Sequence, residues 1–387
     1  MLSLMKILHI TPVYLPATEW GGPVRSVAAL VRGQRDLGHD VTVLTTNSRG
    51  APGLSPHPAG AYGEDGGTVV YHNARLSRRY AFSTSLGQDA RRLAADVDVV
   101  HLHGLWTWPV AAGARACRSR HIPYVLSPRG MLMAWAMSQK SLKKRLYRFL
   151  VQDRNLKAAA ALHCTSDQEH REIPDRYQHI PTLVVPNPIA MDDLLKVPEA
   201  EPGDGPYRLL ICGRIHPVKG FDRLIPALSI VRRNGLDARL AVAGGDEGGY
   251  RDQVLRLAAE HQVTDAVDFL GNLDREQLVQ AYGRAAVLVM PSYQENFGMS
   301  AAEAMAAARP VIATPGVNIA GDIAAAGAGL VVAQDPDALA KAIGELAADP
   351  DRSRNMGNKG RVFVRERYAL QAVATAMVDA YGRISAG

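Results

Sequence analysis

The stretch "AVLVMPSYQENFGMSAAEAMAAARPVIAT", residues Ala286–Thr314, decides the fold. It opens with a short apolar run, passes through a polar link into an alanine-rich helical segment, and ends in a second apolar run. Continuous apolar runs on either side of a helix predict two buried parallel strands joined by a crossover. The link "YQENFGM" then lies at the carboxyl end of the first strand, where open α/β sheets bind their ligands.

The same alternation of apolar runs and helical segments fills the chain. In the first half we expect strands at Met5–Thr11, Asp40–Thr46, Asp98–Gly104 and Pro123–Ser127. In the second half we expect strands at Pro206–Arg214, Ala238–Gly245, Ala266–Gly271, Ala286–Ser292, Pro310–Thr314 and Gly329–Ala333. Strand–helix repeats of this kind predict parallel sheets with helices on both faces.

A chain of 387 residues is about long enough for two domains. The segment from Val184 to Pro206 is rich in proline, glycine and acidic residues, which is typical of a linker. We therefore predict an α/β protein of two Rossmann-like, doubly wound domains, residues 1–189 and 190–368, facing each other across a cleft. The last helical stretch, residues 369–387, has no strand after it and is predicted to cross back to the first domain.

The composition excludes several classes of protein. The three cysteines, Cys117, Cys164 and Cys212, are far apart and odd in number, so neither a disulfide framework nor a structural zinc site is expected. The apolar start "MLSLMKILHITP" resembles a core strand more than a signal peptide. No run reaches the roughly 18 apolar residues that span a bilayer. These observations predict a cytoplasmic protein.

Two loops carry groups suited to an anion. Arg214 and Lys219 follow the first predicted strand of the second domain, in a loop closed by Gly220. Two cations at a strand's carboxyl end suit a diphosphate. The alternative is that they belong to a solvated basic loop, which would have the same sequence pattern. Gly21 and Gly22 follow the first strand of the chain, where backbone N–H groups could approach an anion. This loop lacks the dinucleotide-binding pattern, so a nicotinamide cofactor is disfavoured, and a plain glycine-rich turn is the alternative.

Two acids lie eight residues apart in the opening stretch. Glu295 is in the link, and Glu303 lies about one turn into the helix. A carboxylate at the second position could accept both hydroxyls of a ribose, and the N–H groups around Gly298 to Ser300 could cap a phosphate. The alternative is that Glu303 is a first-turn acid that favours the helix and Glu295 is an ordinary surface acid.

Two elements together resemble a known family. "GRIHPVKGF" contains G-R-x4-K-G, and "ENFGMSAAE", some 80 residues later, contains E-x7-E. In this order and spacing they resemble the retaining glycosyltransferases of family 4, which have the GT-B fold. The resemblance extends over nearly the whole chain, including "GGPVRSV", "CTSDQEHREI" and "VVPNPI".

The resemblance implies roles for these residues. Glu303 would hold the ribose of a nucleotide sugar, Glu295 would contact the transferred sugar, and Arg214 and Lys219 would hold the diphosphate. It also implies an enzyme without cofactor or metal, which retains the α configuration of its donor. The implied donor-binding set is Gly21, Gly22, Arg214, Lys219, Glu295, Asn296, Phe297, Gly298, Met299, Ser300 and Glu303.

Departures from the family pattern concern the first domain. Many relatives have a histidine after the fourth strand, whereas this chain has "LSPRGM", so Arg129 could take that place near a phosphate or the acceptor. His103 and Trp106, in "HLHGLWTWP", could line an acceptor site, and core packing explains them equally well. We count Arg129 with Glu295, Arg214 and Lys219 as candidate catalytic residues.

The net charge of +6 is local. Between Lys140 and Lys157 there are seven basic residues against one acid, Asp153. Leu142, Leu146, Phe149 and Leu150 recur there at helical spacing, so the segment predicts a helix lying on an anionic membrane surface. The predicted membrane-binding residues are Lys140, Lys143, Lys144, Arg145 and Arg148. A helix packed on its own domain is the alternative, and nucleic acid is not an expected partner.

The sequence therefore predicts a cytoplasmic, peripherally membrane-bound glycosyltransferase. Its donor would be a GDP- or UDP-sugar, and its acceptor a glycan on a polyprenyl diphosphate carrier in exopolysaccharide or O-antigen synthesis. Two alternatives remain open: a soluble transferase that acts on a small acceptor or sugar phosphate, and a non-catalytic subunit that binds nucleotide sugars.

Overall fold

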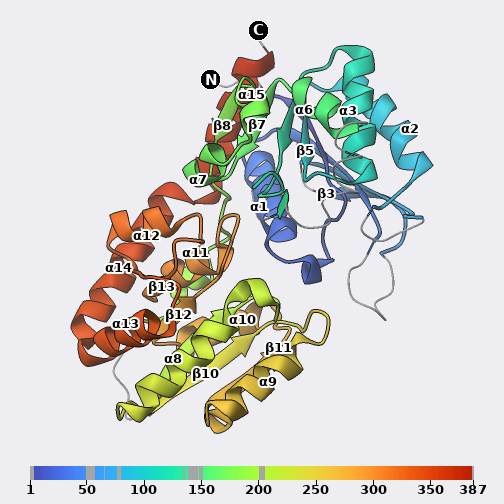
Figure 1. Ribbon diagram of the computed structural model, residues 1–387. Coiled ribbons are helices and arrows are strands. Elements are labelled where there is room, and N and C mark those ends of the chain that lie inside the picture. Colours follow the sequence, from blue (N-terminus) through green and yellow to red (C-terminus); the bar gives the residue numbers. More distant parts are fainter. Residues whose placement is uncertain are drawn as a thin grey trace. The chain divides into compact units, whose positions relative to one another are not determined.

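The computed structural model divides into two compact units (Figure 1). Unit 1 comprises Met1–Pro188 and Leu370–Gly387, and unit 2 comprises Ile189–Ala369. These boundaries lie within two residues of those suggested by the linker and by the last helix. The structure describes residues 4–48, 57–64, 66–75, 80–133, 136–137, 147, 151–199 and 205–385.

Unit 1 contains one eight-stranded sheet. Its order is β3-β4-β2-β1-β5-β6-β7-β8, and every pair is parallel except the β3–β4 hairpin. The strands are β1 (Lys6–Ile10), β2 (Asp40–Thr46), β3 (Gly60–Glu64), β4 (Gly67–His72), β5 (Val99–His103), β6 (Tyr124–Ser127), β7 (Ala161–Cys164) and β8 (Thr182–Val184).

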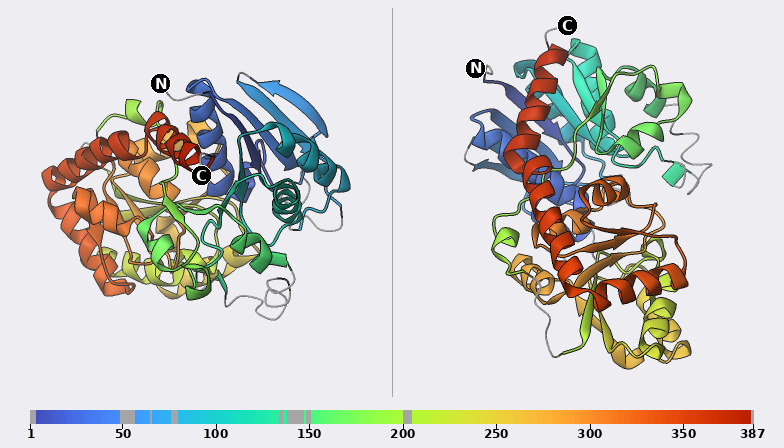
Figure 2. Two further views of the ribbon diagram at one scale, coloured as in Figure 1. Left: turned by 90° about the horizontal axis from the view of Figure 1, so that it is seen from above. Right: turned by 90° about the vertical axis from the view of Figure 1, so that its left-hand side faces the viewer.

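Helices cover both faces of this sheet, because successive strand residues point to opposite faces. Ile7 packs with helices α1 (Gly22–Asp36) and α15 (Leu370–Ser385), while Leu8 packs with α2 (Thr84–Leu93), α3 (Trp108–Arg120) and α6 (Asp153–Lys157). A Cβ on Gly33 would lie 2.9 Å from the Cβ of Ala374, so a glycine lets α15 lie directly against α1. Figure 2 shows this C-terminal helix in red. The short helix α7 (Asp167–Arg171) follows β7.

Unit 2 contains a six-stranded parallel sheet of order β11-β10-β9-β12-β13-β14. The strands are β9 (Tyr207–Cys212), β10 (Ala238–Ala243), β11 (Val267–Gly271), β12 (Val287–Met290), β13 (Val311–Ala313) and β14 (Gly329–Val331). The strand order reverses between β9 and β12. This topological switch point is where doubly wound sheets open a crevice for a ligand.

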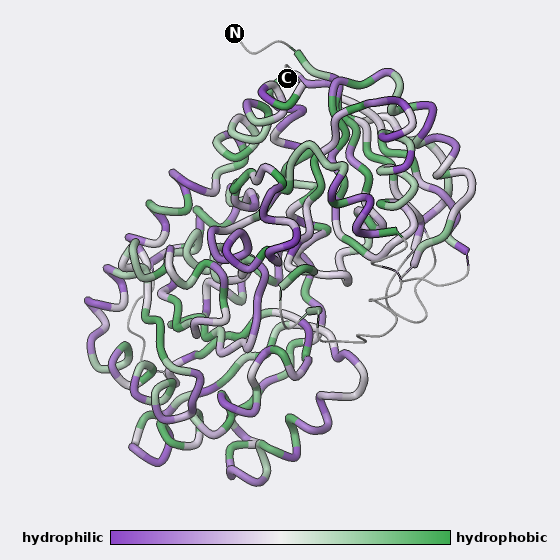
Figure 3. Tube along the Cα trace, turned by 45° about the horizontal axis from the view of Figure 1, so that its top comes forward, coloured by the Kyte–Doolittle hydropathy of each residue, from purple (hydrophilic) through white to green (hydrophobic). Residues whose placement is uncertain are grey.

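Two groups of helices cover the faces of this second sheet. One hydrophobic cluster includes α8 (Phe221–Arg233), α9 (Tyr250–Glu260) and α13 (Pro336–Ala348). The other includes α10 (Arg275–Arg284), α11 (Met299–Ala306), α12 (Ala320–Ala326) and α14 (Pro350–Arg367). Figure 3 shows hydrophobic segments mainly in the interior of the units and hydrophilic segments mainly at the periphery. Short 3-10 helices occur at η1 (Thr18–Trp20), η2 (Ala94–Asp96), η4 (Asp175–Tyr177), η5 (Leu194–Lys196), η6 (Pro217–Lys219) and η7 (Thr264–Ala266).

The predicted α/β class and all ten predicted strands are confirmed. The sequence analysis missed β3, β4, β7 and β8. In the hairpin, β3 contains two glycines and β4 begins with one, while β7 and β8 have only four and three residues. The three cysteines are buried and free. Among the described residues, no helix combines the length and apolar character needed to cross a bilayer. The predicted membrane-binding residues Lys140, Lys143, Lys144, Arg145 and Arg148 lie outside the described residues.

Candidate active site

The loops that follow β9 and β12 are packed against each other at the switch point of unit 2. Gly220, with φ +73°, begins α8 so close to the second loop that a Cβ there would lie 2.1 Å from the Pro291 carbonyl oxygen. Tyr293 N–H donates to the Val218 carbonyl over 2.8 Å. The two loops that carry most of the predicted donor-binding residues therefore form one packed unit.

Lys219 and Glu295 form an ion pair between these loops. Lys219 Nζ lies 2.6 Å from Glu295 Oε1, which also accepts from Ser292 Oγ at 3.2 Å. A Cβ on Gly213 would lie 2.5 Å from Lys219 Nζ, so the glycine makes room for the amine. The side chains are only 12% and 20% exposed, respectively, so water screens this pair less than it screens a surface pair.

Arg214 also has a carboxylate partner. Its Nη1 pairs with Glu247, in the loop after β10, and the Arg214 side chain is half exposed. Both predicted diphosphate-binding cations are therefore ion-paired with carboxylates, and a diphosphate would have to exchange with Glu247 and Glu295.

Glu303, the fifth residue of α11, is buried. Tyr282 OH donates to its Oε2 at 2.9 Å, and Arg275 Nη1 lies 3.5 Å from its Oε1. Arg275 in turn donates to both carboxylate oxygens of Asp193, at 2.7 and 2.5 Å. Burial acts to lower the pKa of Arg275, but the hydrogen bond to Asp193 and the charge of Glu303 raise it overall. The two acids of the opening stretch are thus held by two different cations.

The link between Glu295 and α11 is fixed by the loop after β13. Glu295 N–H donates to the Gly316 carbonyl at 2.8 Å, and Asn318 Nδ2 donates to the Asn296 carbonyl at 2.8 Å. Phe297 is buried, and Gly298, at φ +99°, turns the chain into α11, whose first residues are Met299 and Ser300. The predicted contacts from Glu295 to Ser300 therefore lie on one braced segment.

In unit 1, Gly21 and Gly22 lie at the start of α1. Gly21 precedes the helix with φ +87°, and a Cβ there would meet no atom within 4 Å. Its left-handed backbone conformation, rather than close packing, is the reason for a glycine at this position.

Arg129 is a buried cation just after β6. It is 8% exposed and has φ +51°. Its Nη1 donates to Ser26 Oγ at 3.0 Å and to Asn187 Oδ1 at 3.1 Å, and its Nη2 donates to His103 Nδ1 at 3.1 Å. All three acceptors are neutral. Burial lowers the pKa of Arg129 to about 10, so the guanidinium keeps its charge at neutral pH.

The two predicted acceptor-side residues differ in their surroundings. His103 is buried, and its ring nitrogens contact His9 and Arg129, so contact with an acceptor would require one of these hydrogen bonds to open. Trp106 is half-buried, has φ +63°, and lies edge-on to Tyr147 with ring centroids 6.1 Å apart. Its ring also packs against the hydrophobic core, as the core-packing alternative predicted.

Several polar residues around these sites were not predicted from the sequence. They are Asp193, Glu247, Arg275 and Tyr282 in unit 2, and His9, His101, His163 and Tyr381 in unit 1. A usable signal existed for the histidines, because three of the first half's apolar strands carry one or two of them in "ILHI", "VVHLH" and "ALHC". No local sequence pattern indicated the residues around Glu303, since they come from separate helices and loops.

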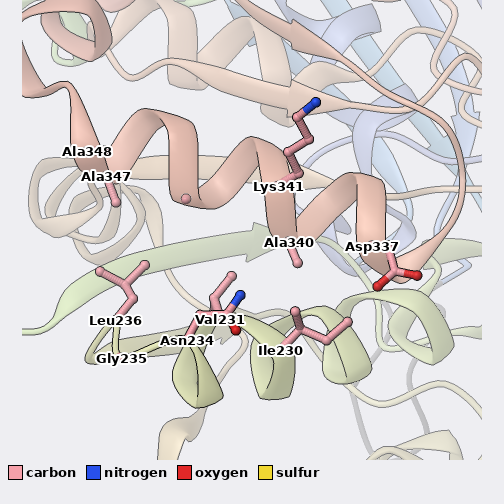
Figure 4. Close-up of a pocket in the computed structure, with 11 residues that line it drawn as sticks. Ile230, Val231, Asn234, Gly235, Leu236, Asp337, Ala340, Lys341, Ala347 and Ala348 are labelled. Carbon is pink, nitrogen blue, oxygen red and sulfur yellow. The ribbon is translucent and has the colours of Figure 1, made fainter.

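A groove of about 580 Å³ lies elsewhere on unit 2 (Figure 4). Its lining comes from the C-terminal part of α8 and the turn after it, including Val231 and Leu236, and from α13, including Asp337 and Lys341. No predicted site residue lines it.

Two family models match adjacent parts of the chain. Residues 21–188 match the glycosyl transferase 4-like domain, and residues 196–363 match glycosyl transferases group 1. Glycogen synthase of Mycobacterium tuberculosis is 29% identical over 97% of this chain and 94% of its own length. D-inositol 3-phosphate glycosyltransferase 2 of Catenulispora acidiphila is 27% identical over 97% and 93%.

Solved structures share the fold. Anabaena HepE in complex with UDP-glucose superposes with a TM-score of 0.75 at 17% identity, over 98% of this chain and 100% of that one. Sucrose-phosphate synthase from Thermosynechococcus elongatus gives a TM-score of 0.72 at 22% identity, over 99% of both chains. The chain belongs to the family 4 type of glycosyltransferases with the GT-B fold.

Proposed function

We propose that this chain transfers an α-linked sugar from a GDP- or UDP-sugar to a glycan hydroxyl, with retention of configuration and without a divalent metal. One observation carries the proposal: Arg214, Lys219, Glu295 and Glu303 all lie on the loops and helix at the carboxyl ends of unit 2's strands, around the switch point between β9 and β12. Nucleotides bind at this position in doubly wound sheets.

Each of these residues has a distinct role in the proposal. The Glu303 carboxylate, held by Tyr282 and Arg275, accepts hydrogen bonds from the ribose hydroxyls. Lys219 and Arg214 exchange their carboxylate partners for the diphosphate. Once Lys219 has moved to a phosphate, Glu295 is free to bind hydroxyls of the transferred sugar. The structure of Anabaena HepE in complex with UDP-glucose, which shares this fold, supports a nucleotide sugar as donor.

The chemical step breaks the bond between the anomeric carbon and the diphosphate oxygen. The acceptor oxygen bonds to that carbon on the same face, which retains the α configuration, and its proton passes to the departing phosphate. Lys219 and Arg214 stabilise the negative charge that develops on the leaving group. A bound metal ion stabilises this charge in metal-dependent enzymes.

The proposed acceptor is a glycan on a polyprenyl diphosphate carrier at the inner face of the cell membrane. Its support is the basic, amphipathic sequence between Lys140 and Lys157, which suits an anionic lipid surface. An acceptor of this kind would place the enzyme in exopolysaccharide or O-antigen assembly.

A small phosphorylated acceptor is the second candidate. Several relatives are named D-inositol 3-phosphate glycosyltransferase, and Arg129 is a buried cation whose three hydrogen-bond acceptors are neutral. A non-catalytic nucleotide-sugar-binding subunit is the third, and the intact set of four charged residues in unit 2 argues against it.

The test is turnover in the presence of a metal chelator. Purified protein is incubated with each nucleotide sugar and with either a polyprenyl-diphosphate-linked oligosaccharide in anionic liposomes or a panel of soluble sugar phosphates. Product formed only with the lipid-linked acceptor, with an α linkage by NMR, supports the proposal. Product from a soluble sugar phosphate selects the second candidate, and donor binding without product from any acceptor selects the third.

A further inference from the structure

Four buried histidines lie side by side on the face of unit 1's sheet that α1 and α15 cover. His9 is on β1, His101 and His103 are on β5, and His163 is on β7. Their ring nitrogens contact one another, with 2.8 Å between His9 and His103 and 3.3 Å between His101 and His163. A run of buried imidazoles is costly unless every nitrogen has a partner of the right kind.

The direction of these hydrogen bonds is fixed at one end by Arg129. A guanidinium can only donate, so His103 Nδ1 accepts and its proton is on Nε2. That proton is donated to His9 Nδ1, which places the proton of His9 on its Nε2. His9 Nε2 then donates to Gln34 Oε1 at 2.7 Å.

The other end is fixed by a carbonyl. Val185 O can only accept, so His163 Nε2 carries the proton at a distance of 2.8 Å. His163 Nδ1 therefore accepts from His101 Nε2, and His101 Nδ1 accepts from Tyr381 OH at 2.5 Å. Gln34 Nε2 faces the same hydroxyl at 3.5 Å. The two halves meet at Tyr381 on α15 without a conflict of donors or acceptors.

The resulting chain runs in one direction through eight residues, and all four histidines are neutral with the proton on Nε2. Its order is Arg129, His103, His9, Gln34, Tyr381, His101, His163 and Val185. Beyond its end, Asn187 accepts from Arg129, so the segment after β8 contacts both ends. A second proton on His9, His103 or His163 would place two donors face to face. A second proton on His101 would require the Tyr381 hydroxyl to accept instead of donate.

We propose that this hydrogen-bond chain orients the Arg129 guanidinium at the acceptor side, and that His103 and Tyr381 are positioning residues for the transfer reaction. Its role in transfer rests on the proposed function, with Arg129 as a candidate acceptor-side cation of the kind that the second candidate acceptor, a sugar phosphate, would contact. Tyr381 gives the C-terminal helix a part in the reaction although its hydroxyl lies in the interior of unit 1.

The hydrogen-bond chain also explains why three of these histidines do not form a metal site. The nearest nitrogens of His9, His101 and His103 all lie within 4.8 Å of one another, which is suitable for a metal. However, the His9 and His103 nitrogens point at each other across 2.8 Å, and the Arg129 cation bonds to the same cluster. A divalent ion would have to displace a proton beside a fixed positive charge.

The first test measures the protonation of the rings and does not depend on activity. In ¹⁵N-histidine-labelled protein, NMR correlation of ring nitrogens with carbon-bound protons is expected to show four Nε2–H tautomers that do not titrate between pH 8 and 6. The charged or titratable groups near the chain are Arg35 on α1, Arg129, Glu169 on α7 and Tyr381 on α15. An Nδ1–H tautomer, titration of one of the four in this range, or a Zn²⁺-induced shift of their signals would overturn the proposal.

The second test measures kinetics. Two substitutions of His103 separate the hydrogen bond made by its Nδ1 from the one made by its Nε2. His103→Gln keeps a donor near the Nε2 position but removes the acceptor of Arg129, whereas His103→Asn keeps an acceptor near Nδ1 and breaks the link to His9. Tyr381→Phe removes only the hydroxyl. Its matched control is Tyr368→Phe, which removes a buried hydroxyl bound to Asp322 in unit 2.

We expect His103→Gln and Tyr381→Phe to lower kcat/KM for the acceptor about tenfold, as misorientation of a reacting group does, with an unchanged donor KM. His103→Asn is expected to lose less than His103→Gln, and Tyr368→Phe to leave the acceptor kcat/KM unchanged. Equal effects of Tyr381→Phe and Tyr368→Phe, or equal changes in donor and acceptor KM, would contradict a positioning role. If wild-type protein turns over no donor, the proposed function fails. The NMR result still decides whether the hydrogen-bond chain exists.

Discussion

Lys219 Nζ lies 2.6 Å from Glu295 Oε1, so the cation proposed to receive the leaving diphosphate is already held by the carboxylate proposed to bind the sugar. The same contact positions both groups in this structure and, under the proposed function, would have to break when the donor binds. This exchange makes Glu295 a residue whose removal should affect nucleotide binding and sugar transfer differently.

Glu295→Gln is therefore expected to separate the two steps. Affinity for the nucleoside diphosphate alone should stay the same or rise, because Lys219 loses its ionic partner, while kcat should fall on the order of 100-fold because the sugar contact weakens. Titration calorimetry with the diphosphate and initial-rate kinetics measure the two effects. Parallel losses in both would show that Glu295 holds the nucleotide itself.

Arg214 makes the corresponding exchange with Glu247. Glu247→Gln should tighten nucleoside diphosphate binding by at most about fivefold, because an exposed ion pair contributes no more than about 1 kcal/mol. The gain should shrink as salt is added, since both charges are near the surface. A loss of affinity would mean that Glu247 supports the bound state of Arg214.

Gly220 should tolerate no side chain. It has φ +73°, and a Cβ would lie 2.1 Å from the Pro291 carbonyl oxygen, so Gly220→Ala should destabilise unit 2 by about 3 kcal/mol or more and separate the two donor loops. Gly235→Ala is the matched control, because Gly235 has φ +92° with no atom within 4 Å of the Cβ position, and strain alone costs roughly 1–2 kcal/mol. Similar urea midpoints for the two variants would contradict the close approach.

Stability should fall in mild acid because of the buried histidines. Burial lowers the pKa of His9 to about 4 and that of His163 to about 3, and holds those of His101 and His103 well below the ordinary value. Unfolded histidines titrate near about 6.5, so between that pH and the folded values the unfolded chain binds more protons. Each such histidine then removes up to about 1.4 kcal/mol per pH unit as the pH decreases.

Urea unfolding of unit 1 at pH 7.5, 6 and 5 measures this slope. His163→Gln keeps a donor for the Val185 carbonyl and removes one titrating group, so its slope should be smaller by about one proton. A free energy of unfolding that does not change between pH 7 and 5 would contradict neutral buried imidazoles.

The basic segment should bind anionic membranes. Replacing Lys143, Lys144, Arg145 and Arg148 with glutamine should abolish flotation with anionic liposomes, since each base contributes about 1 kcal/mol near such a surface. A charge-matched control replaces four exposed arginines of the same unit, Arg91, Arg115, Arg120 and Arg176, and should still float. Retention of the first variant on the liposomes would exclude this membrane contact.

The sequence predicted the strands because buried parallel strands are continuous apolar runs, and such runs stand out between helices. It could not show the hairpin β3–β4, because "GAYGE" has few apolar residues and two glycines. Residue type and spacing suggested Lys219, Glu295 and Glu303 as candidate site residues, but they did not suggest which side chains contact these three. Arg275 reaches Glu303 from a different helix, and this contact depends on how α10 and α11 pack rather than on a local pattern.

The histidine chain shows the same limit in unit 1. A single histidine in an apolar strand suggests only a buried polar residue. Four of them form a directed chain because the order β1-β5-β6-β7 and the contact with α15 bring together residues as far apart as His101 and Tyr381. Strand order and helix docking depend on contacts between residues far apart in the sequence. They cannot be deduced from the spacing of residues along one strand.

The most direct test of the donor site is a thermal-shift panel of nucleoside diphosphates and their sugars in the presence of a metal chelator, for wild type and Glu303→Ala. A ligand that binds only the folded state raises the midpoint. We expect one GDP- or UDP-sugar to stabilise the wild type, and Glu303→Ala to lose most of that shift because the ribose contact is gone. An equal shift in both proteins would contradict the role of Glu303, and no shift with any nucleotide would contradict the donor site itself.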